Sequence, residues 1–155
     1  MSDCMCAMRC FRKFLVVFWG IFWAAALVSN FIGAGQYWGW FGGIGLKGNY
    51  VAINHALAQM HGLSFLPNIF FVLSLVLQVL VVYYFVKAFI NTFKEGEYTG
   101  AVSAFVMAVS VFLLLYAAKL ILLAMGVTID HFATSAFYLI VMQFLALIYV
   151  MLETR

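Results

Sequence analysis

The sequence predicts an all-α membrane protein with four transmembrane helices in an antiparallel bundle and a short amphipathic helix on the outer side. Of the 155 residues, 68% are hydrophobic and 8% are charged, whereas soluble domains carry roughly 25% charged residues. Four stretches are each long enough to cross a bilayer core of about 30 Å, which takes about 20 apolar helical residues. Most basic residues fall on one side of these stretches. We expect one membrane domain over residues 1–155, with no additional soluble domain.

The spans are expected over residues 14–32, 67–89, 101–127 and 132–152, with an outer loop over 33–66. Basic residues precede the first span, as they do in a secretory signal. However, its apolar run is longer than a signal core, and no small-residue cleavage pattern closes it. We therefore interpret it as a retained anchor.

Small residues predict close contacts between helices. Gly20 and Ala24 in the first span are four residues apart, as are Ala104 and Ala108 in the third. This spacing puts both members of a pair on one helix face, where they let two backbones approach closely in lipid.

The distribution of basic residues predicts the orientation, because cytoplasmic loops of membrane proteins carry an excess of Lys and Arg. Only Lys47 falls in a predicted outer loop. Six basic residues share the other side: Arg9, Arg12, Lys13, Lys87, Lys94 and Arg155. Both termini are therefore expected in the cytoplasm, and the outer loop faces the periplasm if the membrane is a bacterial inner membrane.

The predicted outer loop contains the motifs that are most informative about structure and binding. Gly and aromatic residues over 35–43 favour a turn at the headgroups. Asn49 can then cap a short helix that ends near His61, with apolar residues at three- and four-residue intervals.

His55, His61 and His131 would share the outer compartment, which invites a metal or haem hypothesis. Because two residues six apart on a helix are separated by about 120°, His55 and His61 do not form a one-face ligand pair, and hydrogen-bonding histidines are the favoured reading.

Lys119 is the one formal charge within the apolar spans. A charge at the centre of a span costs about 2.5–3.5 kcal/mol on insertion scales, so it needs an explanation. One explanation is snorkelling of its long stem to the outer headgroups. The other is a polar pocket with Gln78 and Gln143, near Asn30, Ser74, Ser110 and Tyr116, that would bind a small anion, a quinone carbonyl or a carboxylate of a partner. For the two glutamines, hydrogen bonding between helices is the favoured interpretation.

All three cysteines, Cys4, Cys6 and Cys10, precede the first span on the predicted cytoplasmic side. A reducing compartment disfavours disulfides, and three thiols lack a clear fourth metal ligand. Acylation of these cysteines beside Arg9 and Arg12 is the remaining hypothesis.

Aromatic rings form two lines on the first span, Phe11, Phe14, Phe18 and Phe22 on one and Trp19 and Trp23 on the other. Rings that face lipid are the ordinary explanation. A long ridge can also seat a neighbouring subunit or a flat hydrophobic ligand.

The segment 49–58 resembles a bacterial family of predicted small integral membrane proteins of unknown function, of similar length and with four spans. Their outer loop is similar to the pattern formed here by Asn49, Tyr50, Ile53, His55, Leu57 and Ala58. The resemblance implies an inner-membrane location and singles out Asn49 and His55. The chain departs from the family in two places: Gln78, and the stretch 59–61 after the histidine, stand where the family tends to carry acidic residues.

No phosphate loop, zinc-protease motif, nucleophile elbow or inward carboxylate pair is present, so we expect no catalysis by this chain alone and no nucleic-acid binding.

The favoured function is a non-catalytic accessory subunit of a larger membrane complex, such as a respiratory or other energy-converting assembly. The subunit would stabilise that complex or line a lipid or quinone path. The alternatives are a homo-oligomeric carrier or channel for a small solute or ion, and a haem- or metal-binding electron-transfer protein. No cofactor is expected beyond a bound lipid or quinone.

Overall fold

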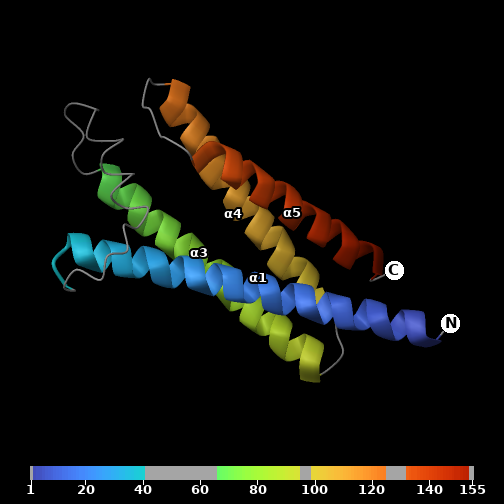
Figure 1. Cartoon of the computed structure of the whole chain (residues 1–155). Coiled ribbons are helices and arrows are strands. Elements are labelled where there is room, and N and C mark those ends of the chain that lie inside the picture. Colours follow the sequence, from blue (N-terminus) through green and yellow to red (C-terminus); the bar gives the residue numbers. More distant parts are fainter. Residues whose placement is uncertain (1, 41–65, 95–98, 125–131, 154–155) are drawn as a thin grey trace.

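The computed structural model describes residues 2–40, 66–94, 99–124 and 132–153, and these residues are helical apart from a turn at 38–40. The helices are α1 (Ser2–Tyr37), α3 (Leu66–Lys94), α4 (Thr99–Ala124) and α5 (Phe132–Glu153) (Figure 1). The expected all-α fold is therefore present. The short outer helix and most of the outer loop lie outside the described residues.

Three of these helices are long and apolar enough to cross a membrane. Within the described residues, the qualifying stretches are Arg9–Gln36, Asn68–Phe93 and Gly100–Ala118, with mean hydropathies of 2.0, 2.6 and 2.3. In α5 the corresponding apolar stretch, Tyr138–Leu152, is shorter. The length and hydropathy of these three helices are consistent with a membrane protein.

The first helix is longer than its apolar run. Arg9, Arg12 and Lys13 were expected to precede it, but they lie inside α1, and residues 33–37 of the expected outer loop are also helical. Hydropathy marks the part of a helix that suits lipid, whereas backbone hydrogen bonding continues into its polar ends.

A glycine ends α1. Gly39 has a φ of 75°, the left-handed conformation that a side chain disfavours. Its N–H donates to the carbonyl of Gln36 at 3.2 Å, and the Trp40 N–H donates to the carbonyl of Gly35 at 2.7 Å. These two bonds form a Schellman motif, which satisfies carbonyls that the helix end would otherwise leave open.

The helices pack mainly on their neighbours in the chain: α1 on α3, α3 on α4, and α4 on α5. The Trp38 ring contacts the Phe71 ring at 6.4 Å, whereas the Lys13 ammonium lies 4.9 Å from the centre of the Phe93 ring. The end of α1 therefore meets the beginning of α3, and its beginning meets the end of α3.

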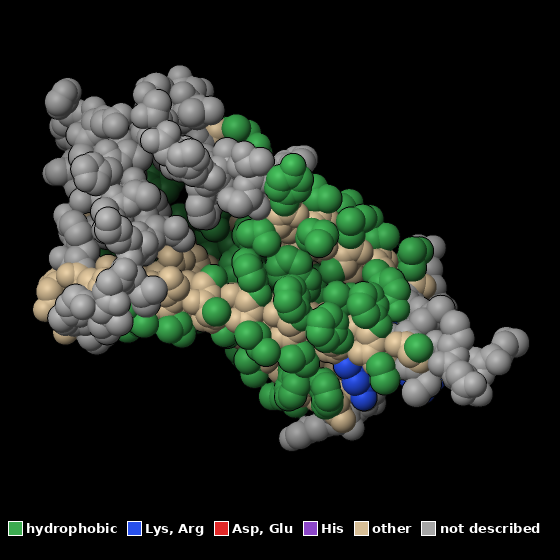
Figure 2. All heavy atoms as spheres, viewed as in Figure 1, with side chains coloured by type: hydrophobic (Ala, Val, Ile, Leu, Met, Phe, Trp, Pro, Cys, Tyr) green, Lys and Arg blue, Asp and Glu red, His purple; other side chains and the backbone are tan. Residues whose placement is uncertain are grey.

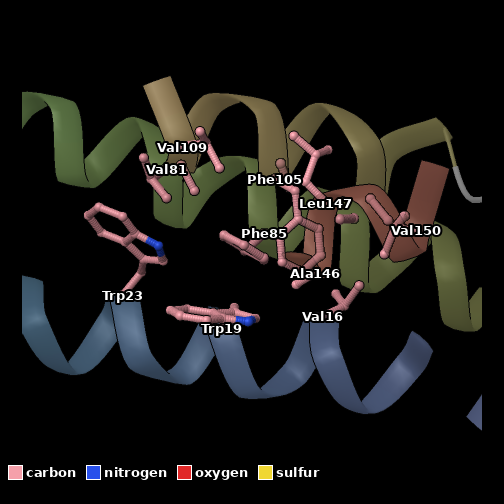
Figure 3. Close-up of a cluster of buried hydrophobic side chains, with 14 of the residues drawn as sticks. Val16, Trp19, Trp23, Val81, Phe85, Phe105, Val109, Ala146, Leu147 and Val150 are labelled. Carbon is pink, nitrogen blue, oxygen red and sulfur yellow. The ribbon is translucent and has the colours of Figure 1, made fainter. Parts of the chain in front are cut away.

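The main core lies where all four helices approach one another. Trp19 and Trp23 of α1 point toward α3 and α4 (Figure 3). The Phe85 and Phe105 rings meet edge to face at 5.2 Å in its centre. Ala146, Leu147 and Val150 close the core from α5.

Three of the four small residues predicted at helix contacts, Gly20, Ala104 and Ala108, lie against neighbouring helices, whereas Ala24 is half-buried. A side chain added at Gly20 would meet Phe85 Cβ at 3.5 Å, so the α1 backbone lies directly against an α3 side chain. Ala104 and Ala108 of α4 are completely buried. Small side chains at these positions let the helices approach without leaving voids.

Candidate functional site

A hydrogen bond between two amide side chains joins α1 to α3. Asn30 Nδ2 donates to Gln78 Oε1 at 3.0 Å. The two side chains are only 5% and 6% exposed. Within an apolar bundle, each amide would lose its water partners on burial, so a mutual hydrogen bond offsets part of that cost. The pair joins the two helices.

The other side chains expected near Gln78 have different roles. The Ser74 hydroxyl donates to the Phe71 carbonyl at 2.8 Å, within its own helix. Ser110 is exposed and Tyr116 is half-buried. Of the expected neighbours, Asn30 is the one that a hydrogen bond brings to Gln78 in the described part of the chain.

Among the described residues, Gln143 of α5 is the most completely buried polar side chain, with 0% exposure. Neither Oε1 nor Nε2 has a hydrogen-bond partner among the described residues. Gln78 belongs to α3, and α4 packs against both α3 and α5. Lys119 belongs to α4, but its side chain lies outside the described residues. A pocket shared by these three residues therefore stays a prediction.

Two further buried polar atoms, Trp23 Nε1 and Thr92 Oγ1, lack a hydrogen-bond partner in the described part of the chain. Trp23 is 2% exposed and its ring lies 4.6 Å from that of Phe112. The sequence had suggested two lines of rings, and its period does indicate that Trp19 and Trp23 share a face. Large aromatic rings on both faces do not by themselves indicate which face turns inward.

Three rings of the phenylalanine line remain on the surface, whereas the fourth, Phe22, is half-buried and packs against the main core. The Phe11 and Phe14 rings stack at 6.2 Å, and the Phe14 and Phe18 rings at 5.9 Å. Phe11, Phe14 and Phe18 are each about half exposed, at 48%, 56% and 48%. We call these three residues the aromatic ridge. Figure 2 shows hydrophobic side chains over most of the described surface on this face of the molecule.

A groove of about 310 Å³ separates the aromatic ridge from α5. The Phe11 and Tyr149 rings meet edge to face at 5.1 Å, so the two helices touch there. All the residues that line the groove are apolar or aromatic: Phe11, Phe14, Leu15, Phe18, Trp19, Met142, Leu145, Ala146 and Tyr149. The arrangement can hold an apolar chain or pack against a hydrophobic surface.

Charged residues gather near the beginning of α1. Arg9 is exposed, Lys13 is half-buried and Arg12 is 4% exposed. The sequence identified all three as orienting charges but gave no sign that Arg12 is enclosed. Its period places Arg12 on the face of Val16 and Trp19, which is the signal that could have revealed this.

The remaining predicted site residues are only partly described. Cys10 carries an exposed free thiol. Cys4 and Cys6 lie within α1 rather than before the helix, and their side chains lie outside the described residues. Asn49, His55, His61 and His131 lie outside them altogether. Among the described residues, no group of three or more His, Cys, Asp or Glu side chains could hold a metal ion.

No family model, curated protein or solved structure matches this chain.

Proposed function

We propose that the chain is a non-catalytic accessory subunit, which crosses a bacterial inner membrane as an antiparallel four-helix bundle and packs against a larger membrane protein. Both termini would face the cytoplasm, because the basic residues near the beginning of α1 and the end of α3 then lie inside. The resemblance of the outer loop to small bacterial membrane proteins agrees with this location.

The observation that carries the proposal is the aromatic ridge. Apolar residues gain little from leaving lipid for another apolar surface, so helices associate in a membrane mainly through close packing. The ridge rings already stack on one another and have few rotamers to lose. A stiff ridge beside a groove offers a partner a shaped surface rather than a merely hydrophobic one.

The hydrogen bond of Gln78 favours this role over a carrier. A carrier built on Gln78, Gln143 and Lys119 needs amides that are free to meet a solute. The Gln78 Oε1 atom instead accepts a hydrogen bond from Asn30. This bond supports the reading of Gln78 as glue between helices.

A small-solute or ion carrier remains the second candidate, and the buried amide of Gln143 favours it. A polar side chain with no partner inside an apolar bundle is costly, and such residues often mark functional sites in membranes. On this alternative, Gln143→Leu would abolish uptake of the solute into proteoliposomes while the fold is retained.

Native purification in mild detergent tests the accessory role. The wild-type chain is expected to elute with larger membrane subunits in a fixed molar ratio, which mass spectrometry would identify. The double variant Phe14→Leu with Phe18→Leu removes two rings of the ridge but keeps the span apolar, and it should lose those subunits.

A matched control uses the same change on another surface. Phe70 and Phe89 are exposed on α3, at 36% and 44%. The variant Phe70→Leu with Phe89→Leu should keep the larger subunits. Recovery of the wild-type chain alone, or equal losses from both double variants, would contradict the proposed role of the ridge.

A further inference from the structure

Two tryptophans form a small cluster just after the end of α1. The Trp38 and Trp40 rings lie 5.0 Å apart, and the Trp38 ring meets the Phe71 ring of α3 edge to face at 6.4 Å. Phe71 is 1% exposed, Trp38 is half-buried and Trp40 is 62% exposed. The cluster therefore begins between α1 and α3 and ends on the surface of the protein.

The backbone of both tryptophans is fixed by the end of the helix. The Trp38 N–H donates to the Ala34 carbonyl at 2.9 Å, and the Trp40 N–H donates to the Gly35 carbonyl at 2.7 Å. Trp40 is thus exposed on an ordered turn. Its ring loses little conformational freedom when it enters another environment.

The position of the cluster along α1 indicates that environment. The apolar stretch of this helix, Arg9–Gln36, ends two residues before Trp38. An indole has an apolar body and one N–H donor, and tryptophan is enriched where hydrocarbon meets the polar headgroups. The wholly apolar rings of the aromatic ridge suit hydrocarbon, whereas an exposed indole at the limit of the apolar stretch suits the headgroups.

The length of α1 fits this placement. Lys13 precedes Trp38 by 25 residues, which is about 37 Å along a helix. At an average tilt of about 20° the two side chains are about 35 Å apart across the membrane. A bilayer is about 30 Å thick in its hydrocarbon core and about 40–45 Å thick with its headgroups. Lys13 and Trp38 therefore fit into opposite headgroup regions at the same time.

We propose that Trp38 and Trp40 are an interfacial anchor, whose indoles insert among the lipid headgroups of the outer leaflet. The proposal rests on the transmembrane orientation proposed above but not on the accessory role. Because Trp38 packs on Phe71, the anchor would also hold the beginning of α3 at the same depth.

Quenching of tryptophan fluorescence by labelled lipids tests the proposal. The purified full chain is reconstituted into phosphatidylcholine vesicles that carry a nitroxide either on the headgroup or near the end of one acyl chain. The difference in fluorescence between the wild type and Trp40→Phe isolates Trp40 and leaves every buried ring in place. The headgroup nitroxide should quench this difference more strongly than the deep nitroxide does.

A control indole in the middle of α1 calibrates the measurement. Val28 is 55% exposed and lies between Lys13 and Trp38 in the chain, about 4 Å along the helix from their midpoint. Val28→Trp therefore adds an indole near the centre of the bilayer without changing the core. The deep nitroxide should quench the added fluorescence more strongly than the headgroup nitroxide does.

The control separates failure of the anchor from failure of the topology. Stronger quenching of Trp40 by the deep nitroxide would overturn the proposal. So would quenching of Trp40 by aqueous acrylamide alone, as expected of a ring that stands in water to meet a protein partner. If neither nitroxide quenches the indole added at position 28, the chain does not cross the bilayer as proposed, and the anchor fails with the topology.

Discussion

Replacement of Gln143 by Met should stabilise the protein, although most changes in a core destabilise it. Gln143 is 0% exposed, and both atoms of its amide lack a partner among the described residues. A Met side chain has nearly the same length and volume, so it should fit the same space without an amide. The change removes only the cost of an enclosed amide.

The expected size follows from the burial of that amide. A buried polar group without a partner costs about 1–3 kcal/mol, and the Met variant should recover that amount. Gln78→Met is the matched control, because Gln78 is 6% exposed but accepts the bond from Asn30 at 3.0 Å. Loss of one interhelical bond in a membrane costs about 0.6 kcal/mol on average and at most about 1.7, so the two variants should differ in sign.

Reversible unfolding in mixed micelles, followed by tryptophan fluorescence, measures both changes. Both variants make the same chemical substitution, so the difference in lipid solubility between Gln and Met is common to them. The two free energies of unfolding should lie about 2 kcal/mol apart. A Gln143→Met variant less stable than the wild type would refute the reasoning, because the Gln143 amide would then form a hydrogen bond in the folded protein.

Three further predictions concern packing and topology. Gly20→Ala should fold normally, because the added Cβ would meet Phe85 at an ordinary 3.5 Å, whereas Gly20→Leu should cost about 1–3 kcal/mol by overpacking; equal stability of the two would contradict the close contact. Phe105→Ala should cost about 3–5 kcal/mol in the same unfolding assay, and a cost below about 1 kcal/mol would mean that the core is not packed as described. In a chain whose own cysteines are replaced, a single cysteine at Lys94 should be shielded from an impermeant thiol reagent added outside, and one at Lys47 should react; the opposite result would reverse the orientation.

The sequence predicts the helices well, because a long apolar stretch indicates a membrane helix whichever of its faces packs against other helices. Hydropathy marks all four helices, and the four-residue spacing of Gly20 and Ala24 predicts the close packing at Gly20. It misjudges the beginning of α1, since Arg9, Arg12 and Lys13 are poor in lipid but ordinary in a helix. The apolar signal therefore predicts the membrane segment better than the helix itself.

Burial is harder to predict than helix formation for the same reason. In a soluble helix the apolar stripe marks the core, but α1 carries large aromatic rings both on the face of Phe14 and on the face of Trp19. Phe14 is 56% exposed, whereas Trp19 is 4% exposed. The hydrogen-bond partner of Gln78 also depends on the axial offset between α1 and α3. Contacts such as the one between Lys13 and Phe93 set that offset.

The packing of each helix on its chain neighbour bears on how the protein is made. On the proposed membrane topology, each helix would find the helix on which it packs already in the bilayer during synthesis, because α3 packs on α1, α4 on α3 and α5 on α4. Such an order keeps contacts local, which favours fast assembly and few misfolded intermediates. Some contacts join helices that are not neighbours in the chain: the Trp23 ring of α1 lies 4.6 Å from the Phe112 ring of α4, and the Phe11 ring of α1 meets the Tyr149 ring of α5. The seam between α1 and α5 therefore forms only after α5 has been synthesised.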